Sequence, residues 1–330
     1  MRRVTRNFIT GMIAASCLLA ATLSMAVGPY PERPVTIVVP TPPGGLIDRV
    51  ARAFGQQLQS ELGQAVVLDN RVGASGKIGV QSALRAPRDG YTLIAVSPSI
   101  TSVNPAVDKT VGYDPLKDFD ALGIVARNSG VVAVRAGLPV ASMRELVAYA
   151  RARPDQLTYG SFCIGTSLHL HSEELAQVLG ITLRHIPYKG EAQALNALVA
   201  GEVDLMLYVT GPVVQFAQGG RVRALAATSA QRWASLPNVP SSAESGVPEL
   251  QGYAYQSWVG FVLPSGAPPD VAERLGQASR AAIARPELRR LLEAQGFEVV
   301  DGTAVDMRQV IAAELARNRS LLASGRVRRE

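Results

Sequence analysis

Apolar residues along this chain occur in short runs of valine, isoleucine and leucine, and segments with helical spacing separate these runs. The first run, at residues 35–39, is continuous, which is typical of a strand that is covered on both faces. Comparable runs predict strands at residues 65–69, 91–96, 121–127, 131–135, 157–161, 183–186, 203–207, 222–228 and 258–263. Strands that alternate with helices in this way predict an α/β fold built mainly on parallel sheet.

The segments between the strands have the spacing of amphipathic helices. Residues 142–151 carry Ser142 and, three positions later, Glu145, which is the spacing of a capping box. An apolar stripe in residues 304–323 predicts a helix that packs on the body of the protein. Further helices are predicted directly after the first turn, and at residues 77–86, 167–179, 191–200, 212–218, 269–284 and 287–295.

Two of the strand–turn–helix units share one design. The first strand runs into Gly44 and Gly45, which let the backbone turn sharply and leave room for a close approach. The following helix points its unpaired N–H groups and its positive dipole end into that space, an arrangement that binds a carboxylate or phosphate. The strand at residues 157–161 leads into a similar turn before Ser167. Because ligand sites favour the carboxyl ends of strands and the clefts between domains, the sequence predicts two lobes with a cleft between them.

The N-terminus has the features of a secretory signal peptide. Arg2, Arg3 and Arg6 precede a mostly apolar stretch at residues 8–25, and the small residues Ser24 and Ala26 predict cleavage after Ala26. The alternative is a membrane anchor, for which the apolar run is short. We therefore expect an exported protein that resides in the periplasm.

Charge and cysteine content narrow the possible partners. Loss of the signal peptide removes three arginines and no acids, so the net charge falls by three, from +6 to +3. This charge is too small to indicate binding to nucleic acid or to an anionic membrane. Cys17 leaves with the signal peptide, so Cys163 has no intramolecular disulfide partner and the core must hold the fold.

Motifs for catalysis and metal binding are missing from the sequence. There is no G-x-S-x-G, no G-x-x-x-x-G-K-[ST] and no G-x-G-x-x-G, so we expect no catalytic residues and no cofactor. His169 and His171 stand two positions apart on a predicted helix and therefore point to different faces, so we expect no metal site.

Several motifs, in their order and spacing, resemble those of one receptor family. They include Tyr30-Pro31-Glu32-Arg33-Pro34, Pro43-Gly44-Gly45 with Asp48, Asp89-Gly90-Tyr91-Thr92-Leu93 and His185-Ile186-Pro187-Tyr188-Lys189-Gly190. The chain is similar over almost its whole mature length to the Bug-type receptors, the extracytoplasmic solute-binding proteins of tripartite tricarboxylate transporters.

The resemblance implies a two-lobed type II periplasmic-binding-protein fold with a ligand cleft between the lobes. Residues 1–26 would be the signal peptide, residues 27–126 with 227–330 the first lobe, and residues 127–226 the second. A monomer would capture a small organic acid and deliver it to the membrane permease subunits of a tripartite tricarboxylate transporter. The alternatives are a ligand-sensing partner of a membrane sensor kinase and an enzyme that acts on a small acid.

Main-chain N–H groups in the two turns are expected to hold the carboxylate of the ligand. Asp48 would either orient the first turn or bind a ligand ammonium group, and Asp204 would either contact the ligand or play a structural role. The predicted ligand-binding residues are Thr41, Pro43, Gly44, Gly45, Leu46, Ile47, Asp48, Ser97, Ser161, Cys163, Gly165, Thr166, Ser167 and Asp204.

Four residues depart from the family pattern in these turns, and the first is Thr41, which stands where an aromatic residue is often found. Leu46 stands where a glycine is usual, Ile47 replaces a serine or threonine, and Cys163 replaces a glycine. Because these changes remove a hydroxyl and add apolar bulk, we expect a monocarboxylate with an apolar or aromatic body rather than a small polar diacid.

Overall fold

The computed structural model describes residues 30–162, 164 and 166–323. The chain divides into a short unit, Met1–Glu32, and a large compact unit, Arg33–Glu330. Of the short unit, residues 30–32 are described, and they form no helix or strand. The predicted signal peptide lies outside the described residues. Every element named below belongs to the large unit.

The first group of strands surrounds β1. β1 is parallel to both of its neighbours, and two longer strands and a short one extend the sheet in antiparallel fashion. The order is β2-β1-β3-β9-β4, with β10 also on β4. The strands are β1 (Val35–Val39), β2 (Val66–Asn70), β3 (Thr92–Val96), β4 (Phe119–Arg135), β9 (Gln256–Pro264) and β10 (Glu298–Gly302).

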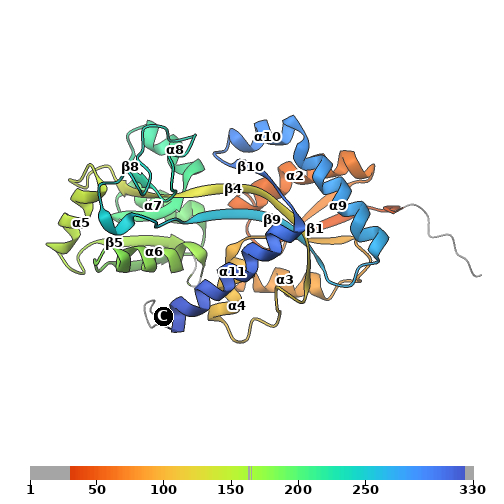
Figure 1. Cartoon of the computed structure of the whole chain (residues 1–330). Coiled ribbons are helices and arrows are strands. Elements are labelled where there is room, and N and C mark those ends of the chain that lie inside the picture. Colours follow the sequence, from red (N-terminus) through yellow and green to blue (C-terminus); the bar gives the residue numbers. More distant parts are fainter. Residues whose placement is uncertain (1–29, 163, 165, 324–330) are drawn as a thin grey trace, which may run out of the picture. The chain divides into compact units, whose positions relative to one another are not determined.

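The second group of strands shares β4 with the first. The end of β4 pairs antiparallel with β7 (Leu205–Val209) and β8 (Val222–Ala227), and β5 (Thr158–Phe162) lies parallel to β7 and to β6 (Arg184–Tyr188). β4 and β9 run between two clusters of helices and strands, as Figure 1 shows.

The prediction of two strands at residues 121–127 and 131–135 was wrong, because the structure has a single strand there. Asn128 and Ser129 stay in register with β9, and Gly130 pairs with β7. These polar and small residues interrupt the apolar run without leaving the ladder, so hydrophobicity alone suggested a break.

The helices cover the two groups of strands separately. α2, α3 and α9 lie around the end that contains β1, whereas α5, α6, α7 and α8 lie around the end that contains β5 (Figure 1). They are α2 (Leu46–Leu62), α3 (Lys77–Leu84), α4 (Asn104–Val107), α5 (Met143–Arg151), α6 (Ser167–Val178), α7 (Glu191–Ala200), α8 (Thr210–Gln218), α9 (Pro269–Ala284), α10 (Pro286–Glu293) and α11 (Ala304–Ala323). Short helical turns occupy Ala74–Gly76 (η2), Ser99–Val103 (η3) and Pro248–Leu250 (η4).

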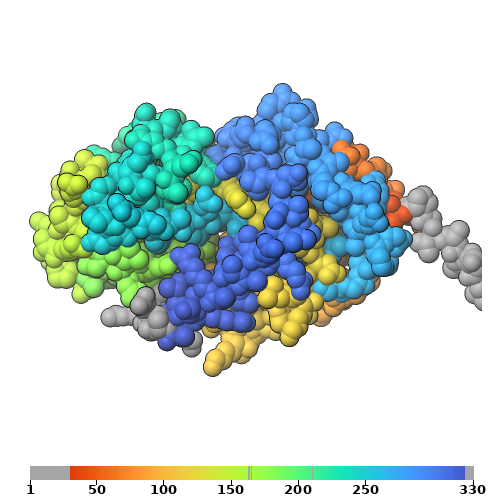
Figure 2. Space-filling view, viewed as in Figure 1, coloured from red at the N-terminus to blue at the C-terminus, as the bar shows by residue number. Residues whose placement is uncertain are grey.

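Two local predictions are confirmed. Ser142 is the N-cap of α5, and its Oγ accepts the Glu145 N–H at 3.2 Å, whereas Glu145 Oε2 accepts the N–H of Ala141, one residue before the N-cap, at 2.7 Å. The apolar stripe of α11 faces the body of the protein, with Met307 and Ile311 almost wholly buried. In Figure 2, α11 crosses the molecular surface between the regions of α4 and α6.

The strands and the helices packed on them form the hydrophobic core. Val35, Ile37 and Val39 of β1 are wholly buried, as expected for a strand covered on both faces. Phe54 of α2 stacks on Phe261 of β9, with ring centroids 4.2 Å apart. Among the helices that the structure describes, none has the length and apolar character that crossing a bilayer requires.

Candidate functional site

The first turn joins β1 to α2 and is held by Asp48. Asp48 Oδ2 accepts the Gly44 N–H at 2.8 Å, and Arg52 and Asn70 donate to the same carboxylate at 2.8 and 2.9 Å. Gly44 has φ of 82°, a backbone conformation that favours glycine. Burial raises the pKa of Asp48, but the hydrogen bonds outweigh it, so the pKa lies below its ordinary value. Asp48 therefore orients the turn.

The other predicted residues of the first turn differ in exposure. Pro43 and Gly44 are exposed, whereas Leu46 and Ile47 are buried, with 6% and 5% exposure. The Thr41 carbonyl accepts from Asn70 at 3.1 Å. Thr41 Oγ1 is buried and has no hydrogen-bond partner within the described part of the chain.

The side chain of Glu191 contacts the start of α2, although Glu191 was not among the predicted ligand-binding residues. Glu191 is the first residue of α7, and its Oε2 accepts the Leu46 N–H at 3.1 Å. A Cβ built on Gly45 would lie 3.8 Å from both Glu191 oxygens. Burial raises the pKa of Glu191; the Leu46 N–H and the Arg49 charge oppose this, yet the pKa remains above its ordinary value.

The second turn joins β5 to α6. Thr166 is the N-cap: its Oγ1 accepts the His169 N–H at 3.4 Å and donates to the Phe162 carbonyl at 2.9 Å. The Ser167 N–H donates to Ser99 Oγ at 3.0 Å, and Ser167 Oγ donates to the Tyr255 hydroxyl at 3.2 Å. Cys163 and Gly165 lie outside the described residues.

Hydrogen bonds among the described residues connect the first turn and its neighbours to the second turn and its neighbours. Leu46 meets Glu191 and Ser99 meets Ser167, as given above. In addition, Ser75 Oγ donates to the carbonyl of Ile164 at 3.3 Å. Segments that follow β1, β2 and β3 therefore contact segments that follow β5 and β6, and the N-termini of α2 and α6 both lie at this junction.

The strands below the junction carry an amide group without partners. Asn128 is 1% exposed, and neither its Nδ2 nor its Oδ1 has a hydrogen-bond partner among the described residues. Asn128 pairs with Ser257 of β9, and paired residues point to the same face. Ser257 also hydrogen-bonds to Tyr255, whose pKa burial raises to about 12. Asn128 thus lies on the face where Tyr255 reaches Ser167.

The remaining predicted residues lie in different places. Ser97 directly follows β3, and its carbonyl accepts the N–H groups of Ile100 and Thr101. Ser161 Oγ lies 2.7 Å from His185 Nε2. Asp204 accepts from Arg135 Nε at 2.8 Å and from the Thr158 N–H at 2.9 Å. Thr158 begins β5 and the second turn follows its end, about 13 Å along the strand. This position favours a structural role for Asp204.

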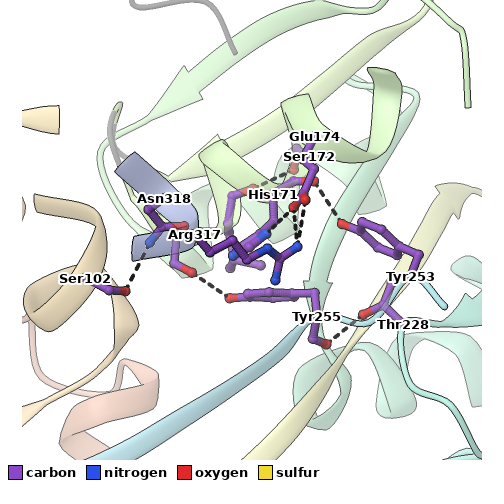
Figure 3. A network of polar contacts seen from close by, with 11 residues as sticks. Ser102, His171, Ser172, Glu174, Thr228, Tyr253, Tyr255, Arg317 and Asn318 are labelled. Atoms are coloured by element: carbon purple, nitrogen blue, oxygen red, sulfur yellow. Dashed lines mark hydrogen bonds and ion pairs between the residues drawn. The ribbon is translucent and has the colours of Figure 1, made fainter. Parts of the chain in front are cut away.

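A polar cluster joins α11 to α6 (Figure 3). Arg317 Nη2 lies 2.6 and 2.8 Å from the two oxygens of Glu174, and His171 Nδ1 lies 2.8 Å from Glu174 Oε2. Burial lowers the pKa of His171 even though Glu174 opposes this. The pKa of Glu174, which burial alone would raise, is held below its ordinary value by His171 and Arg317. A cavity of about 200 Å³ lies beside this cluster, lined in part by Ser102 and Tyr255.

The two helix histidines contact different rings. His169 stacks on His185 at 4.3 Å, whereas His171 lies 4.3 Å from the ring of Tyr255. Within residues 30–162, 164 and 166–323, no three His, Cys, Asp or Glu side chains are placed to hold a metal ion.

Four residues at the junction were missed by sequence reasoning: Ser99, Asn128, Glu191 and Tyr255. An acid at the first position of a helix is ordinarily explained by the helix dipole, so Glu191 gave no distinctive signal. Asn128 did leave one, because it is a polar residue between two apolar runs of one strand.

The strand order and the solved structures reported below define a two-lobed type II periplasmic-binding-protein fold, as predicted. The chain belongs to the family described as tripartite tricarboxylate transporter family receptor, whose profile matches residues 50–325. The expected resemblance to Bug-type receptors is confirmed.

Relatives and solved structures agree with this assignment. The chain is 32% identical to the protein BugT of Bordetella pertussis, over 94% of both chains. The structure of Rpa4515 from R. palustris with adipate is 35% identical, covers 90% of this chain and 99% of its own, and has a TM-score of 0.84. MatC from Rhodopseudomonas palustris with bound malate is 27% identical, covers 89% and 100%, and has a TM-score of 0.81.

Proposed function

We propose that this protein is a periplasmic receptor that captures a small organic acid between two lobes and delivers it to a tripartite tricarboxylate-type permease. Residues 27–126 with 227–330 would form one lobe and residues 127–226 the other, after cleavage of a signal peptide at residues 1–26. Family membership and the acids bound by Rpa4515 and MatC support this function. The observation that carries it is that the starts of α2 and α6 both lie where the two groups of elements are hydrogen-bonded to each other, and that the Ser167 N–H is held there by the neutral hydroxyl of Ser99, which a carboxylate can replace.

The mechanism is transport through closure of the lobes. A carboxylate that accepts N–H groups at a helix start gains charge-assisted hydrogen bonds and a favourable dipole. A ligand that contacts both lobes binds the closed form more tightly than the open form and shifts the population towards it. The permease then distinguishes loaded from empty receptor by the closed surface.

Replacing Ser167 by proline tests the role of the main-chain amide. Ser167 is the first residue of α6, a position where proline fits the helix, so the variant loses the N–H and keeps the helix. Loss of one hydrogen bond to a charged ligand weakens binding by about tenfold or more. Isothermal titration calorimetry with a panel of monocarboxylates and dicarboxylates, which includes adipate, the ligand of Rpa4515, measures the effect on each acid that binds.

Two controls accompany this variant. Ser167→Ala keeps the N–H and removes only the hydroxyl that contacts Tyr255. Ala304→Pro places a proline at the first position of α11, an exposed site far along the chain. We expect both controls to bind within a few-fold of the native protein. Equal affinity of Ser167→Pro and Ser167→Ala for every acid that binds would reject main-chain capture at α6.

The body of the ligand is a second part of the proposal. Leu46 and Ile47 add apolar side chains to the first turn, so an apolar or aromatic monocarboxylate should bind more tightly than malate or citrate. The same calorimetric panel with benzoate and phenylacetate decides this point. Tight binding of malate or citrate without binding of either aromatic acid would contradict it.

A further inference from the structure

The two helix starts at the junction carry different partners. At α2, the Leu46 N–H is held by a carboxylate, that of Glu191. At α6, the Ser167 N–H is held by a neutral hydroxyl, that of Ser99. The N–H at the start of α2 therefore already binds a carboxylate of the chain itself. The N–H at the start of α6 binds a neutral oxygen, which a ligand carboxylate can replace.

The carboxyl group of Glu191 has few partners among the described residues. Arg49, one turn into α2, lowers the pKa of Glu191, but the hydrogen bond that holds Glu191 in place comes from the Leu46 N–H. Asp48, the other acid of this turn, is fully engaged with Gly44, Arg52 and Asn70. Glu191 is thus the acid of this turn that is held by a single main-chain N–H, and both of its oxygens lie against Gly45, 3.8 Å from the position that a Cβ would take there.

Asn128 supplies the complementary group. Its amide is buried, on the same face as Ser257 and Tyr255, and both its donor and its acceptor are unpartnered in the described part of the chain. A buried amide without partners is costly in a protein that has nothing to bind there. It fits a ligand group that both donates and accepts hydrogen bonds.

We propose that Glu191 determines the charge class of the ligand: the site accepts monocarboxylates whose far end is a hydroxyl or ammonium group and rejects dicarboxylates. This inference rests on the proposed function. The ligand carboxylate binds at α6, and its far end lies towards Glu191 and Asn128. A donor at that end meets two acceptors, whereas a second carboxylate meets a like charge in a partly buried site.

The test uses acids that differ only at the far end. One set is adipate, 6-hydroxyhexanoate and 6-aminohexanoate, and the shorter set is succinate, 4-hydroxybutyrate and 4-aminobutyrate. Calorimetry at pH 8 compares the native protein with Glu191→Gln, which keeps the shape and removes the charge. Glu202→Gln removes one charge from an exposed position just beyond the other end of α7 and serves as the control.

We expect the native protein and Glu202→Gln to prefer the hydroxy or amino acid over the diacid by about tenfold or more. In Glu191→Gln, we expect this preference to fall to within about threefold, through tighter diacid binding. Equal preference in all three proteins would overturn the inference and leave the proposed function intact. An equal rise in affinity for every acid in Glu191→Gln would also overturn it, because Glu191 would then only occupy the site and have to move away when any acid binds. No binding of any carboxylate by any protein would reject the proposed function itself.

Discussion

Replacing Glu314 by glutamine should remove a pH dependence of folding stability that this one carboxyl creates. Glu314 lies on α11, where Trp258 Nε1 donates to Oε1 at 2.9 Å and Ser102 Oγ donates to Oε2 at 3.1 Å. Burial raises the pKa of Glu314 from 4.5 to about 7, although these hydrogen bonds and the charges of Arg317 and Arg127 oppose the rise.

The sign of the effect follows from proton binding. Between pH 4.5 and about 7, folded Glu314 keeps a proton that the unfolded chain has released. Raising the pH through this window therefore favours the unfolded state, and above it the loss is complete. At about 1.4 kcal/mol for each pKa unit, the carboxyl lowers the free energy of unfolding by about 3 kcal/mol across the window.

Urea denaturation between pH 4.5 and 8 measures this contribution as the difference between the native protein and Glu314→Gln. The difference is needed because His171, whose pKa burial lowers, stabilises the fold as pH rises. Glutamine keeps an acceptor for Trp258. The free energy of unfolding of the variant, relative to that of the native protein, should therefore rise by about 1–3 kcal/mol from low to high pH. Glu298→Gln, at an exposed position, should follow the native curve. Parallel curves for Glu314→Gln and the native protein would refute the reasoning.

Three further substitutions separate structural roles from ligand contact. Asp48→Asn weakens the hold on the Gly44 N–H, and we expect it to lower the free energy of unfolding by about 1–2 kcal/mol and to weaken acid binding, both measurable on one preparation. Asp204→Asn should cost about 1–3 kcal/mol in urea denaturation yet leave the dissociation constant of any bound acid within about twofold; a large loss of affinity would place it at the ligand. Arg317→Met leaves Glu174 without its charged partner and should destabilise the protein by about 1–3 kcal/mol, and an unchanged urea midpoint would contradict that.

Local signals in the sequence predicted several helices to the residue. α9 begins with Pro269 at its first position, and α7 ends at Ala200, directly before Gly201, which has the left-handed conformation that favours glycine. α11 was found from its apolar stripe. These signals lie within a few residues of the element, so they do not depend on the rest of the fold.

Contacts between segments that are far apart along the chain could not be predicted from the sequence. Leu46 and Glu191 are 145 positions apart, and nothing in either segment indicates the other. β10 is a short strand that exists because it pairs with β4, so no pattern of its own predicted it. Asn128 fell between two predicted strands, because its place in β4 depends on its pairing with Ser257 of β9.

A crystal structure of the complex with the tightest-binding acid of the panel tests the central claim most directly. The account predicts a ligand carboxylate oxygen about 3 Å from the Ser167 N–H, with the rest of the ligand between the starts of α2 and α6. A carboxylate bound elsewhere, for example in the cavity beside Arg317 and Ser102, with the Ser167 N–H still held by Ser99, would contradict it.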